Sequence, residues 1–181
     1  MATVVLGERP AELESWLTRR RALGQDRHDE MWKGDYHVVP GPSAEHAVVD
    51  SRLARLLWPR AERAGLHMTT AFNLGESDDY RVPDGGLHRA QPSGIFVPTA
   101  AMVVEVVSPA DETFAKLRFY AQHAVGEVLV ADPALRTVRI WQLRPGLASG
   151  SREPEPSYGE TGRSDLLTIS GSMLADELSW P

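Results

Sequence analysis

Residues 101–132 read AMVVEVVSPADETFAKLRFYAQHAVGEVLVAD, which is two apolar runs joined by a helical pattern. The first run, residues 101–107, is almost entirely apolar, and such a run is typical of a strand that is buried on both faces of a sheet. Residues 114–123 carry apolar side chains at helical spacing, and residues 128–131 form the second apolar run. Glu105 places a carboxyl group within the first apolar run, which is unusual for a strand expected in the hydrophobic core.

The sequence around this segment predicts further strands and helices on both sides. Two helices are expected: residues 10–23, and a long helix that Ser43 caps and Gly65 ends. Strands are expected at residues 36–39, 66–74, 80–82, 137–143 and 166–169, and a terminal helical turn follows around Leu174. Residues 137–143 should pair antiparallel with residues 128–131. The order of elements favours an α/β (α+β) fold with a mixed central β-sheet flanked by helices.

Length and composition limit the class of protein. The 181 residues suit a single domain over residues 1–181, and 42% hydrophobic and 24% charged residues are ordinary values for a folded protein. Residues 1–28 are interpreted as an N-terminal helical extension, and residues 144–164, rich in proline and polar residues without periodicity, as a long loop. The net charge of −6 excludes a uniformly basic nucleic-acid coat protein, although it leaves room for a local basic groove.

Several classes of site and location are excluded by what the sequence lacks. The absence of cysteine excludes disulfides, thiolate zinc sites, iron–sulfur clusters and a cysteine nucleophile, so metal ligands must be oxygen or imidazole groups. The sequence contains neither a GxxxxGK[ST] phosphate loop nor a GxSxG nucleophile elbow. No stretch approaches the roughly 20 consecutive apolar residues of a membrane helix, and the first residues lack a secretory pattern. We therefore expect a cytoplasmic protein that does not insert into a membrane.

Two carboxylates carry the strongest chemical signal. Burying an ionised Glu105 alone costs several kcal/mol, so a cation or hydrogen-bond donors should meet it. Asp84 lies at the end of an earlier strand, and two carboxylates on adjacent strands can share Mg²⁺ with waters and a phosphate. Purely structural roles stay open as well: residues 84–86 form a turn signal, Glu105 could pair with Arg81, and Lys116 could be a solvated helix residue.

The order of these motifs resembles the PD-(D/E)xK superfamily of restriction-endonuclease-like proteins and, within it, the Uma-two family. The resemblance rests on DEMWKGDYHVVPGPSAEH, RVPDGGLHR, VVEVVSPADETFAKLRFYAQHAVGEVLVADP and the closing SWP, which extend from about residue 29 to the C-terminus. VVEVVSP followed by KLRFYAQHAV is the most specific part. The resemblance implies a restriction-endonuclease-like core, with a mixed sheet of about four or five strands between helices.

The resemblance also implies the site residues. Asp84 and Glu105 take the places of the family's metal-binding acidic pair, and the main-chain carbonyl of Val106 is a further metal ligand. The superfamily has a lysine two positions after the glutamate, where this chain has Val107. In the family this lysine has moved to the following helix, and Lys116 is the matching residue, placed to orient the attacking water or to help to deprotonate it.

Three further residues match family positions at the site: Tyr120, one helical turn after Lys116; His46, near the start of the long helix; and Glu30, before the first core strand. For His46, a partly exposed histidine at a helix start fits the sequence equally well. The remaining histidines show no metal-ligand spacing and are expected to be surface or interface residues: His28, His37, His67, His88 and His123.

These residues imply a Mg²⁺- or Mn²⁺-dependent endonuclease that hydrolyses phosphodiester bonds of DNA, and a homodimer is a further expectation. Phosphate contacts would come from Arg52, Arg55, Arg60 and Arg63, or from residues 19–21, which could also simply complement a helix dipole. Two alternatives remain: an inactive nuclease-like fold that serves as a DNA-binding or protein-interaction module, and a metal-dependent hydrolase of a smaller phosphodiester. A salt-bridged Glu105 without a cleft would favour the module.

Overall fold

The computed structural model describes residues 4–6, 11–109, 112–144 and 157–181. Within these residues, a six-stranded core sheet has the order β12 (Ser157–Glu160), β11 (Thr137–Arg144), β10 (Glu127–Asp132), β9 (Met102–Val106), β7 (Gly85–His88) and β4 (His67–Thr70). A second six-stranded sheet has the order β1 (Val4–Leu6), β3 (Asp35–Val38), β2 (Glu30–Trp32), β6 (Asp79–Arg81), β5 (Asn73–Glu76) and β8 (Phe96–Val97). A short ribbon joins β13 (Arg163–Ser164) to β14 (Ile169–Ser170).

The helices are α1 (Ala11–Ala22), α2 (Ala44–Arg63), the 3₁₀ turn η1 (Thr113–Lys116), α3 (Leu117–Gln122) and α4 (Gly171–Glu177). The Ser43 side chain accepts a hydrogen bond from the His46 N–H and so caps α2, as the sequence predicts. Among the described residues, no helix combines the length and apolar character needed to cross a membrane.

The strand–helix–strand unit predicted from residues 101–132 forms the centre of the core sheet. Strand β9 pairs parallel with β10, and the connection between them carries η1 and α3. Strand β11 pairs antiparallel with β10, and β7 pairs antiparallel with β9. The sheet is therefore mixed, which confirms the predicted fold class.

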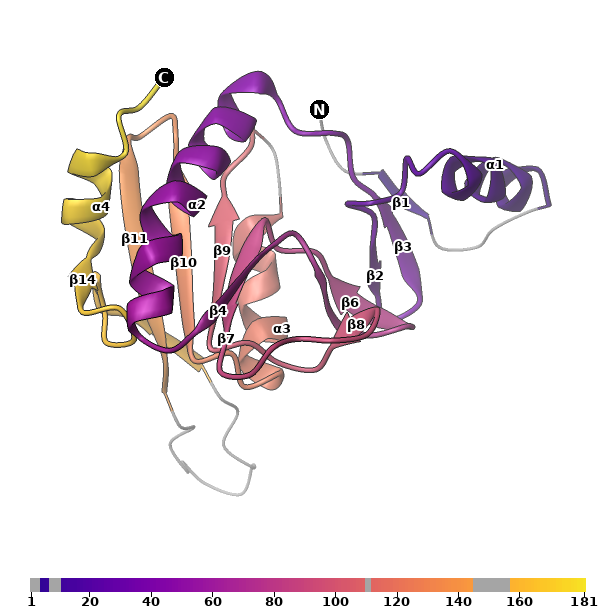
Figure 1. The fold of residues 1–181 in the computed structure, drawn as a ribbon. Helices are drawn as coiled ribbons and strands as arrows, with labels where there is room; N and C mark the ends of the chain where they lie inside the picture. Colours follow the sequence, from indigo (N-terminus) through magenta and orange to yellow (C-terminus); the bar gives the residue numbers. More distant parts are fainter. Residues whose placement is uncertain (1–3, 7–10, 110–111, 145–156) are drawn as a thin grey trace, which may run out of the picture.

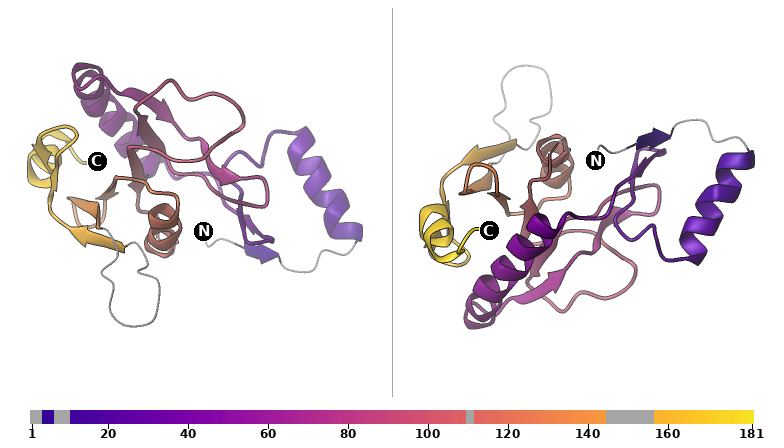
Figure 2. Two further views of the ribbon diagram at one scale, coloured as in Figure 1. Left: turned by 90° about the horizontal axis from the view of Figure 1, so that it is seen from below. Right: turned by 90° about the horizontal axis from the view of Figure 1, so that it is seen from above.

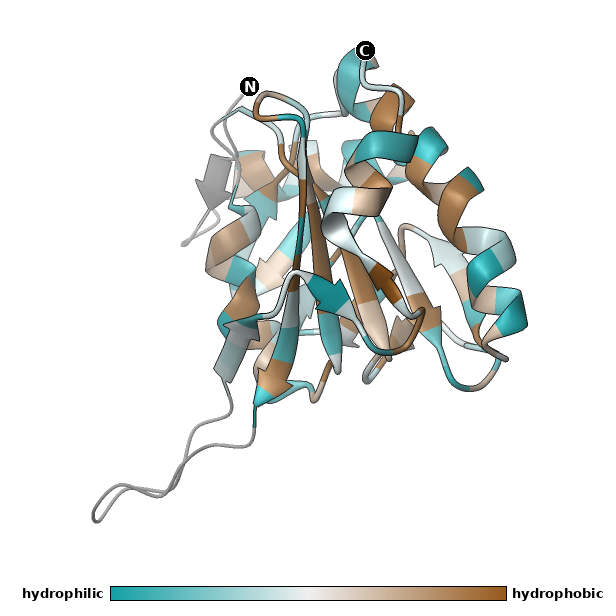
Figure 3. Cartoon of the chain, turned by 90° about the vertical axis from the view of Figure 1, so that its left-hand side faces the viewer, coloured by the Kyte–Doolittle hydropathy of each residue, from teal (hydrophilic) through white to brown (hydrophobic). Residues whose placement is uncertain are grey.

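Helices cover both faces of the core sheet (Figures 1 and 2). Apolar side chains of α2 and α4 pack on one face, against residues such as Val104 and Leu129, whereas α3 packs on the other, against Val103 and Val128. Successive residues of β9 point to opposite faces, so both faces of this strand are buried, and all its residues except Glu105 are apolar. The hydrophobic colouring of the central strands shows the same pattern (Figure 3).

A buried arginine ties the second sheet to the core. The guanidinium of Arg81 on β6 lies 4.1 Å from the ring of Trp32 on β2 and 4.0 Å from the ring of Phe119 on α3. Only 4% of Arg81 is exposed, and its Nη1 donates hydrogen bonds to the Met31 carbonyl and to Asp79. Cation–π contacts on both sides of one cation hold β2 and β6 against α3, which places Glu30 and Lys116 beside each other.

The structure corrects the interpretation of Gly85 and Gly86 as a bend. Both residues belong to the buried strand β7, which pairs with β4 and β9. A Cβ atom on Gly86 would lie 2.5 Å from the ring of Phe72, and one on Gly85 would lie 3.1 Å from the Thr69 carbonyl. Glycine is needed here because neighbouring groups approach the strand closely. From the sequence alone, by contrast, a Gly-Gly dipeptide is typical of a turn.

Other boundaries also differ from the sequence prediction. The predicted strand 66–74 is two strands, β4 and β5, in different sheets, and residues 166–168 of the predicted strand 166–169 form a turn before β14. The predicted loop 144–164 contains the whole of β12 and β13, while residues 145–156 lie outside the described part. The N-terminal extension 1–28 contains α1, and also β1, which pairs with β3; residues 1–3 and 7–10 lie outside the described part. Pairing with a distant strand cannot be read from local periodicity.

Candidate active site

The two predicted metal-binding carboxylates are brought together where β7 begins and β9 ends. Gly85 pairs with Val104 in the antiparallel ladder, so the same register continued by one residue places Asp84 opposite Glu105. Directly opposite residues of an antiparallel pair project to the same face of the sheet. The Asp84 Oδ2 atom also accepts a hydrogen bond of 2.8 Å from the Val106 N–H. Asp84, Glu105 and the Val106 peptide group therefore form one cluster.

Glu105 is 3% exposed and has two partners on the η1–α3 segment. The Lys116 ammonium lies 3.4 Å from its Oε1 atom, and the Tyr120 hydroxyl donates a hydrogen bond to the same oxygen. Burial raises the pKa of Glu105 to about 8, although Lys116 and the Tyr120 hydrogen bond act in the opposite direction. Burial therefore favours the protonated form of Glu105 at neutral pH, and a bound cation would favour its carboxylate form. The pairing with Lys116 replaces the pairing with Arg81 that the sequence left open.

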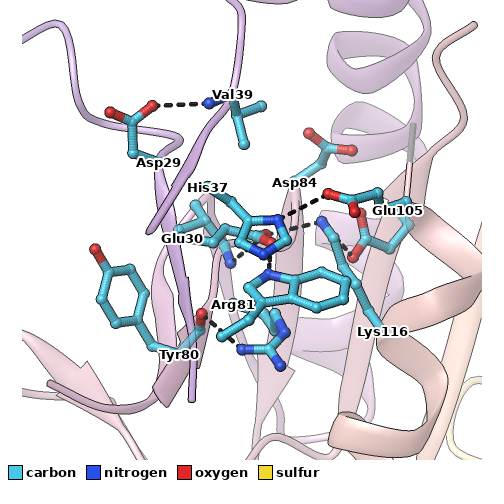
Figure 4. A network of polar contacts seen from close by, with 12 residues as sticks. Asp29, Glu30, His37, Val39, Tyr80, Arg81, Asp84, Glu105 and Lys116 are labelled. Carbon is cyan, nitrogen blue, oxygen red and sulfur yellow. Dashed lines mark hydrogen bonds and ion pairs between the residues drawn. The ribbon is translucent and has the colours of Figure 1, made fainter. Parts of the chain in front are cut away.

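Lys116 is held from the other side by Glu30 on β2 (Figure 4). Its ammonium lies 2.9 Å from Glu30 Oε1, which also accepts the Val82 N–H at 2.8 Å. The second oxygen, Oε2, accepts the Trp32 indole N–H at 2.7 Å. Burial opposes the positive charge, but Glu105 and then Glu30 raise the pKa of Lys116 above its ordinary value. Lys116 is therefore a cation at neutral pH, and Glu30 fixes its position.

Asp84 is fixed by α2 as well as by β9. Its Oδ1 atom lies 3.0 Å from Nε2 of His46, and the other ring nitrogen of His46, Nδ1, lies 2.9 Å from the Ser108 hydroxyl. Burial opposes the charged imidazole, but the hydrogen bond and the charge of Asp84 raise the pKa of His46. One helical turn further along α2, burial and the charge of Asp84 raise the pKa of Asp50 to about 6. The negative charge around Asp84 therefore favours a bound cation.

These side chains line one cleft of about 290 Å³ between the two sheets. Its walls come from the first turn of α2 and the preceding loop, from the ends of β7 and β9, and from η1. The charged and titratable groups in it are His28, Glu30, His46, Asp84, Glu105, Glu112 and Lys116. All the predicted site residues line this cleft except Tyr120, which is fully buried behind Glu105.

The donor set fits a hard divalent cation. Carboxylate oxygens of Asp84 and Glu105 and the carbonyl of Val106 are ligands that suit Mg²⁺ or Mn²⁺, and Mg²⁺ in proteins commonly has one or two carboxylate ligands with waters completing its shell. Among the described residues, no group of three or more His, Asp or Glu side chains is arranged to hold a metal ion. Two carboxylates and one carbonyl would leave coordination positions for water on such a cation, as catalysis requires.

The sequence analysis missed Ser108 at the cleft and the burial of two histidines that do not line it. Ser108, which directly follows the apolar run 101–107, contacts His46. His37 and His88, expected at the surface, are 5% and 3% exposed. His37 stacks on Trp32 and lies 3.0 Å from Glu112, so it links β3 to the segment before η1. The position of Ser108 directly after the strand of Glu105 could have indicated a place at the site. For His37 the sequence offers no such indication, because its partner Glu112 is distant in the chain.

The arginines predicted to contact phosphate are in part used elsewhere. Arg20 forms an ion pair of 2.9 Å with the buried Asp29, and Arg60 forms one of 2.8 Å with Glu177 on α4. Arg52 donates a hydrogen bond to the Ser179 carbonyl. These contacts lie within the protein, so we do not assign the three arginines to a phosphate-binding surface.

Comparisons with known proteins agree with this fold. The family profile Uma2, described as "Putative restriction endonuclease", matches residues 10–170. A solved structure from Anabaena variabilis, described as "a putative nuclease belonging to DUF820", is similar with a TM-score of 0.60 and 13% sequence identity, over 83% of this chain and 90% of that chain. That likeness concerns the fold alone. No curated protein matches the sequence.

Proposed function

Because this chain belongs to the Uma2 family, whose description is that of a restriction endonuclease, we propose that it hydrolyses phosphodiester bonds of DNA with the help of Mg²⁺ or Mn²⁺. The family and the nuclease-like fold support a nuclease function. The metal dependence, the DNA substrate and the individual roles of the site residues belong to the proposal.

One observation carries the proposal: two carboxylates that lie opposite each other on β7 and β9 share a cleft with a buried lysine. Asp84 and Glu105 both line the cleft, and Lys116 contacts Glu105 at 3.4 Å. A salt bridge at Glu105 is also what a non-catalytic module would have. The cleft supports the nuclease function over the module, because a purely structural ion pair does not require a cavity beside it.

The residues then have separable roles. A divalent cation held by Asp84, Glu105 and the Val106 carbonyl would supply an activated water and would stabilise charge on the scissile phosphate. Glu105 and Glu30 raise the pKa of Lys116, so its ammonium would donate hydrogen bonds and orient the water or a phosphate oxygen rather than act as a base. Glu30 holds Lys116, and Tyr120 stays protonated because burial and Glu105 raise its pKa, so its hydroxyl orients Glu105.

The test is cleavage of supercoiled plasmid and short oligonucleotides with Mg²⁺, with Mn²⁺ and with EDTA. We expect Asp84→Asn and Glu105→Gln to reduce cleavage by more than about 100-fold, which exceeds the 10–100-fold typical of residues that only support a metal ligand. Asp78→Asn, at an exposed position in the β5–β6 turn, is the matched control and should cleave normally. Cleavage that survives both site substitutions would refute the assignment.

Two further arms address the alternatives. A small phosphodiester substrate, assayed in parallel, separates a nuclease from a hydrolase of smaller phosphodiesters. DNA binding without cleavage under every metal condition would favour the non-catalytic module. We also propose that the protein forms a homodimer, as twofold assemblies are common, and light scattering coupled to chromatography tests this directly.

A further inference from the structure

Three polar side chains from separate elements form a continuous hydrogen-bonded row at the cleft. The Ser108 hydroxyl, just after β9, lies 2.9 Å from Nδ1 of His46 on α2, and Nε2 of His46 lies 3.0 Å from Asp84 Oδ1. His46 itself is held at the start of α2, because its backbone N–H donates to the Ser43 hydroxyl. The row therefore joins the end of β9 to the start of α2 and then to the beginning of β7.

When His46 is neutral, the available donors and acceptors fix the direction of each hydrogen bond. An ionised carboxylate only accepts, so the His46 nitrogen beside Asp84, Nε2, must carry the proton. A neutral imidazole has one N–H, which leaves Nδ1 as an acceptor that requires a donor. The Ser108 hydroxyl can be that donor. A neutral His46 with the opposite tautomer would turn a lone pair toward the Asp84 carboxylate.

We propose that Ser108 is a positioning residue that fixes the tautomer and the ring orientation with which His46 holds the metal-binding carboxylate of Asp84. This inference rests on the proposed metal site. The Val106 N–H donates a hydrogen bond to the Oδ2 atom of Asp84. Both carboxylate oxygens therefore have a donor only while His46 presents Nε2–H to the Oδ1 atom. Because Ser108 follows Glu105 and Val106 on the same segment, the end of β9 sets one carboxylate directly and orients the other through His46.

The role of Ser108 differs from that of a residue that merely stabilises the fold. Residues that orient metal ligands typically change metal affinity by 10–100-fold when they are altered. Since Ser108 acts through His46, we expect Ser108→Ala to weaken Mn²⁺ binding by roughly tenfold. Ser108→Thr retains the hydroxyl and should restore most of the affinity. Ser51→Ala removes a hydroxyl from an exposed position of α2 and is the matched control.

Two measurements on the whole protein test the inference. The first is the ¹⁵N chemical shifts of the histidine rings, recorded where His46 is neutral and assigned with a His46→Gln variant. We expect the Nε2–H tautomer in the wild type, Ser108→Thr and Ser51→Ala, and a mixture of tautomers in Ser108→Ala. The second is calorimetric titration of the metal-free proteins with Mn²⁺ alone, in the absence of DNA.

The outcomes separate this inference from the proposed function. A tautomer change together with weaker Mn²⁺ binding in Ser108→Ala supports both. A tautomer change in a protein that binds no Mn²⁺ keeps the role of Ser108 as the donor to His46 but overturns the metal site. An Nδ1–H tautomer in the wild type, or unchanged tautomer and affinity in Ser108→Ala, overturns the inference even if DNA is cleaved.

Discussion

Replacing Lys116 by methionine removes the ammonium group that lies between Glu30 and Glu105. Both carboxylates are buried, at 2% and 3% exposure, so neither can recover its hydration. Glu30 keeps the Val82 N–H and Trp32 indole donors, and Glu105 keeps only the Tyr120 hydroxyl among the contacts described. The main cost should therefore fall on Glu105.

The distances set the magnitude. At 3.4 Å from Glu105 and 2.9 Å from Glu30, the Coulomb attraction is about 5–6 kcal/mol for each pair at an effective dielectric constant of about 20. Part of this Coulomb energy offsets the cost of removing the ammonium from water. Experience with buried ion pairs sets the scale, since removing one partner typically costs about 3–5 kcal/mol of stability. Protonation of Glu105 limits the loss, so we expect Lys116→Met to lower the free energy of unfolding by about 3 kcal/mol at pH 8.

The loss should depend on pH in a defined direction. Without the ammonium, the pKa of Glu105 in the folded state lies far above its value of about 4.3 in the unfolded state. The folded variant then binds more protons than the unfolded one between these values, so its free energy of unfolding falls as pH rises. The wild-type carboxyl, with a pKa of about 8, binds the same extra proton at lower pH, so the two proteins separate only where it ionises. The variant should consequently be closer to the wild type at pH 6 than at pH 9.

Urea unfolding followed by tryptophan fluorescence measures these differences. The double variant Lys116→Met/Glu105→Gln removes both charges, and a double-mutant cycle should give a coupling of about 2 kcal/mol. Lys33→Met, at an exposed position, is the control and should change stability little. A loss below about 0.5 kcal/mol in Lys116→Met, with no coupling to Glu105, would refute the view that Lys116 neutralises this carboxylate.

Three other perturbations test the packing around the site. Gly86→Ala should destabilise the protein by about 1–3 kcal/mol, because its Cβ would lie 2.5 Å from the Phe72 ring. Gly41→Ala is the control, since a Cβ at that position would have no other atom within 4 Å. Equal urea midpoints for the two variants would contradict the close packing of β7. Arg81→Met should cost about 2–4 kcal/mol through lost cation–π contacts and ion pairing, and wild-type stability in thermal unfolding would contradict this. Burial lowers the pKa of His88, so the folded state binds fewer protons than the unfolded state below about pH 6.5. The stability of the wild type relative to His88→Gln should therefore fall as pH drops from 7.5 to 5, and a pH-independent difference would argue against a buried neutral His88.

The part of the fold that could be predicted is the part encoded by local patterns. Strand β9, the long helix α2 and the antiparallel pairing of β10 with β11 follow from apolar runs, a capping serine and alternation, all of which depend on near neighbours in the chain. Strands β3 and β6 match predicted strands, but their assembly with β2 and β5 into a second sheet could not be predicted, because these strands are only three or four residues long and half-polar. β2–β3 and β5–β6 are local hairpins, but the pairing of Met31 with Tyr80 that joins them connects residues far apart in sequence.

The same division applies to the candidate site. Asp84 and Glu105 were identifiable because a carboxylate in an apolar strand requires compensation, and the order of motifs placed Lys116 and Tyr120 on the following helical segment. The contacts of these groups could not be identified from the sequence. The Lys116–Glu30 pair and the Ser108–His46–Asp84 row join residues that lie far apart in the chain, and the burial of His37 likewise depends on distant segments. The sequence alone indicates that a buried charge needs a partner. Only the tertiary structure determines which partner lies within hydrogen-bonding distance, because these contacts depend on ångström-scale geometry that no local pattern encodes.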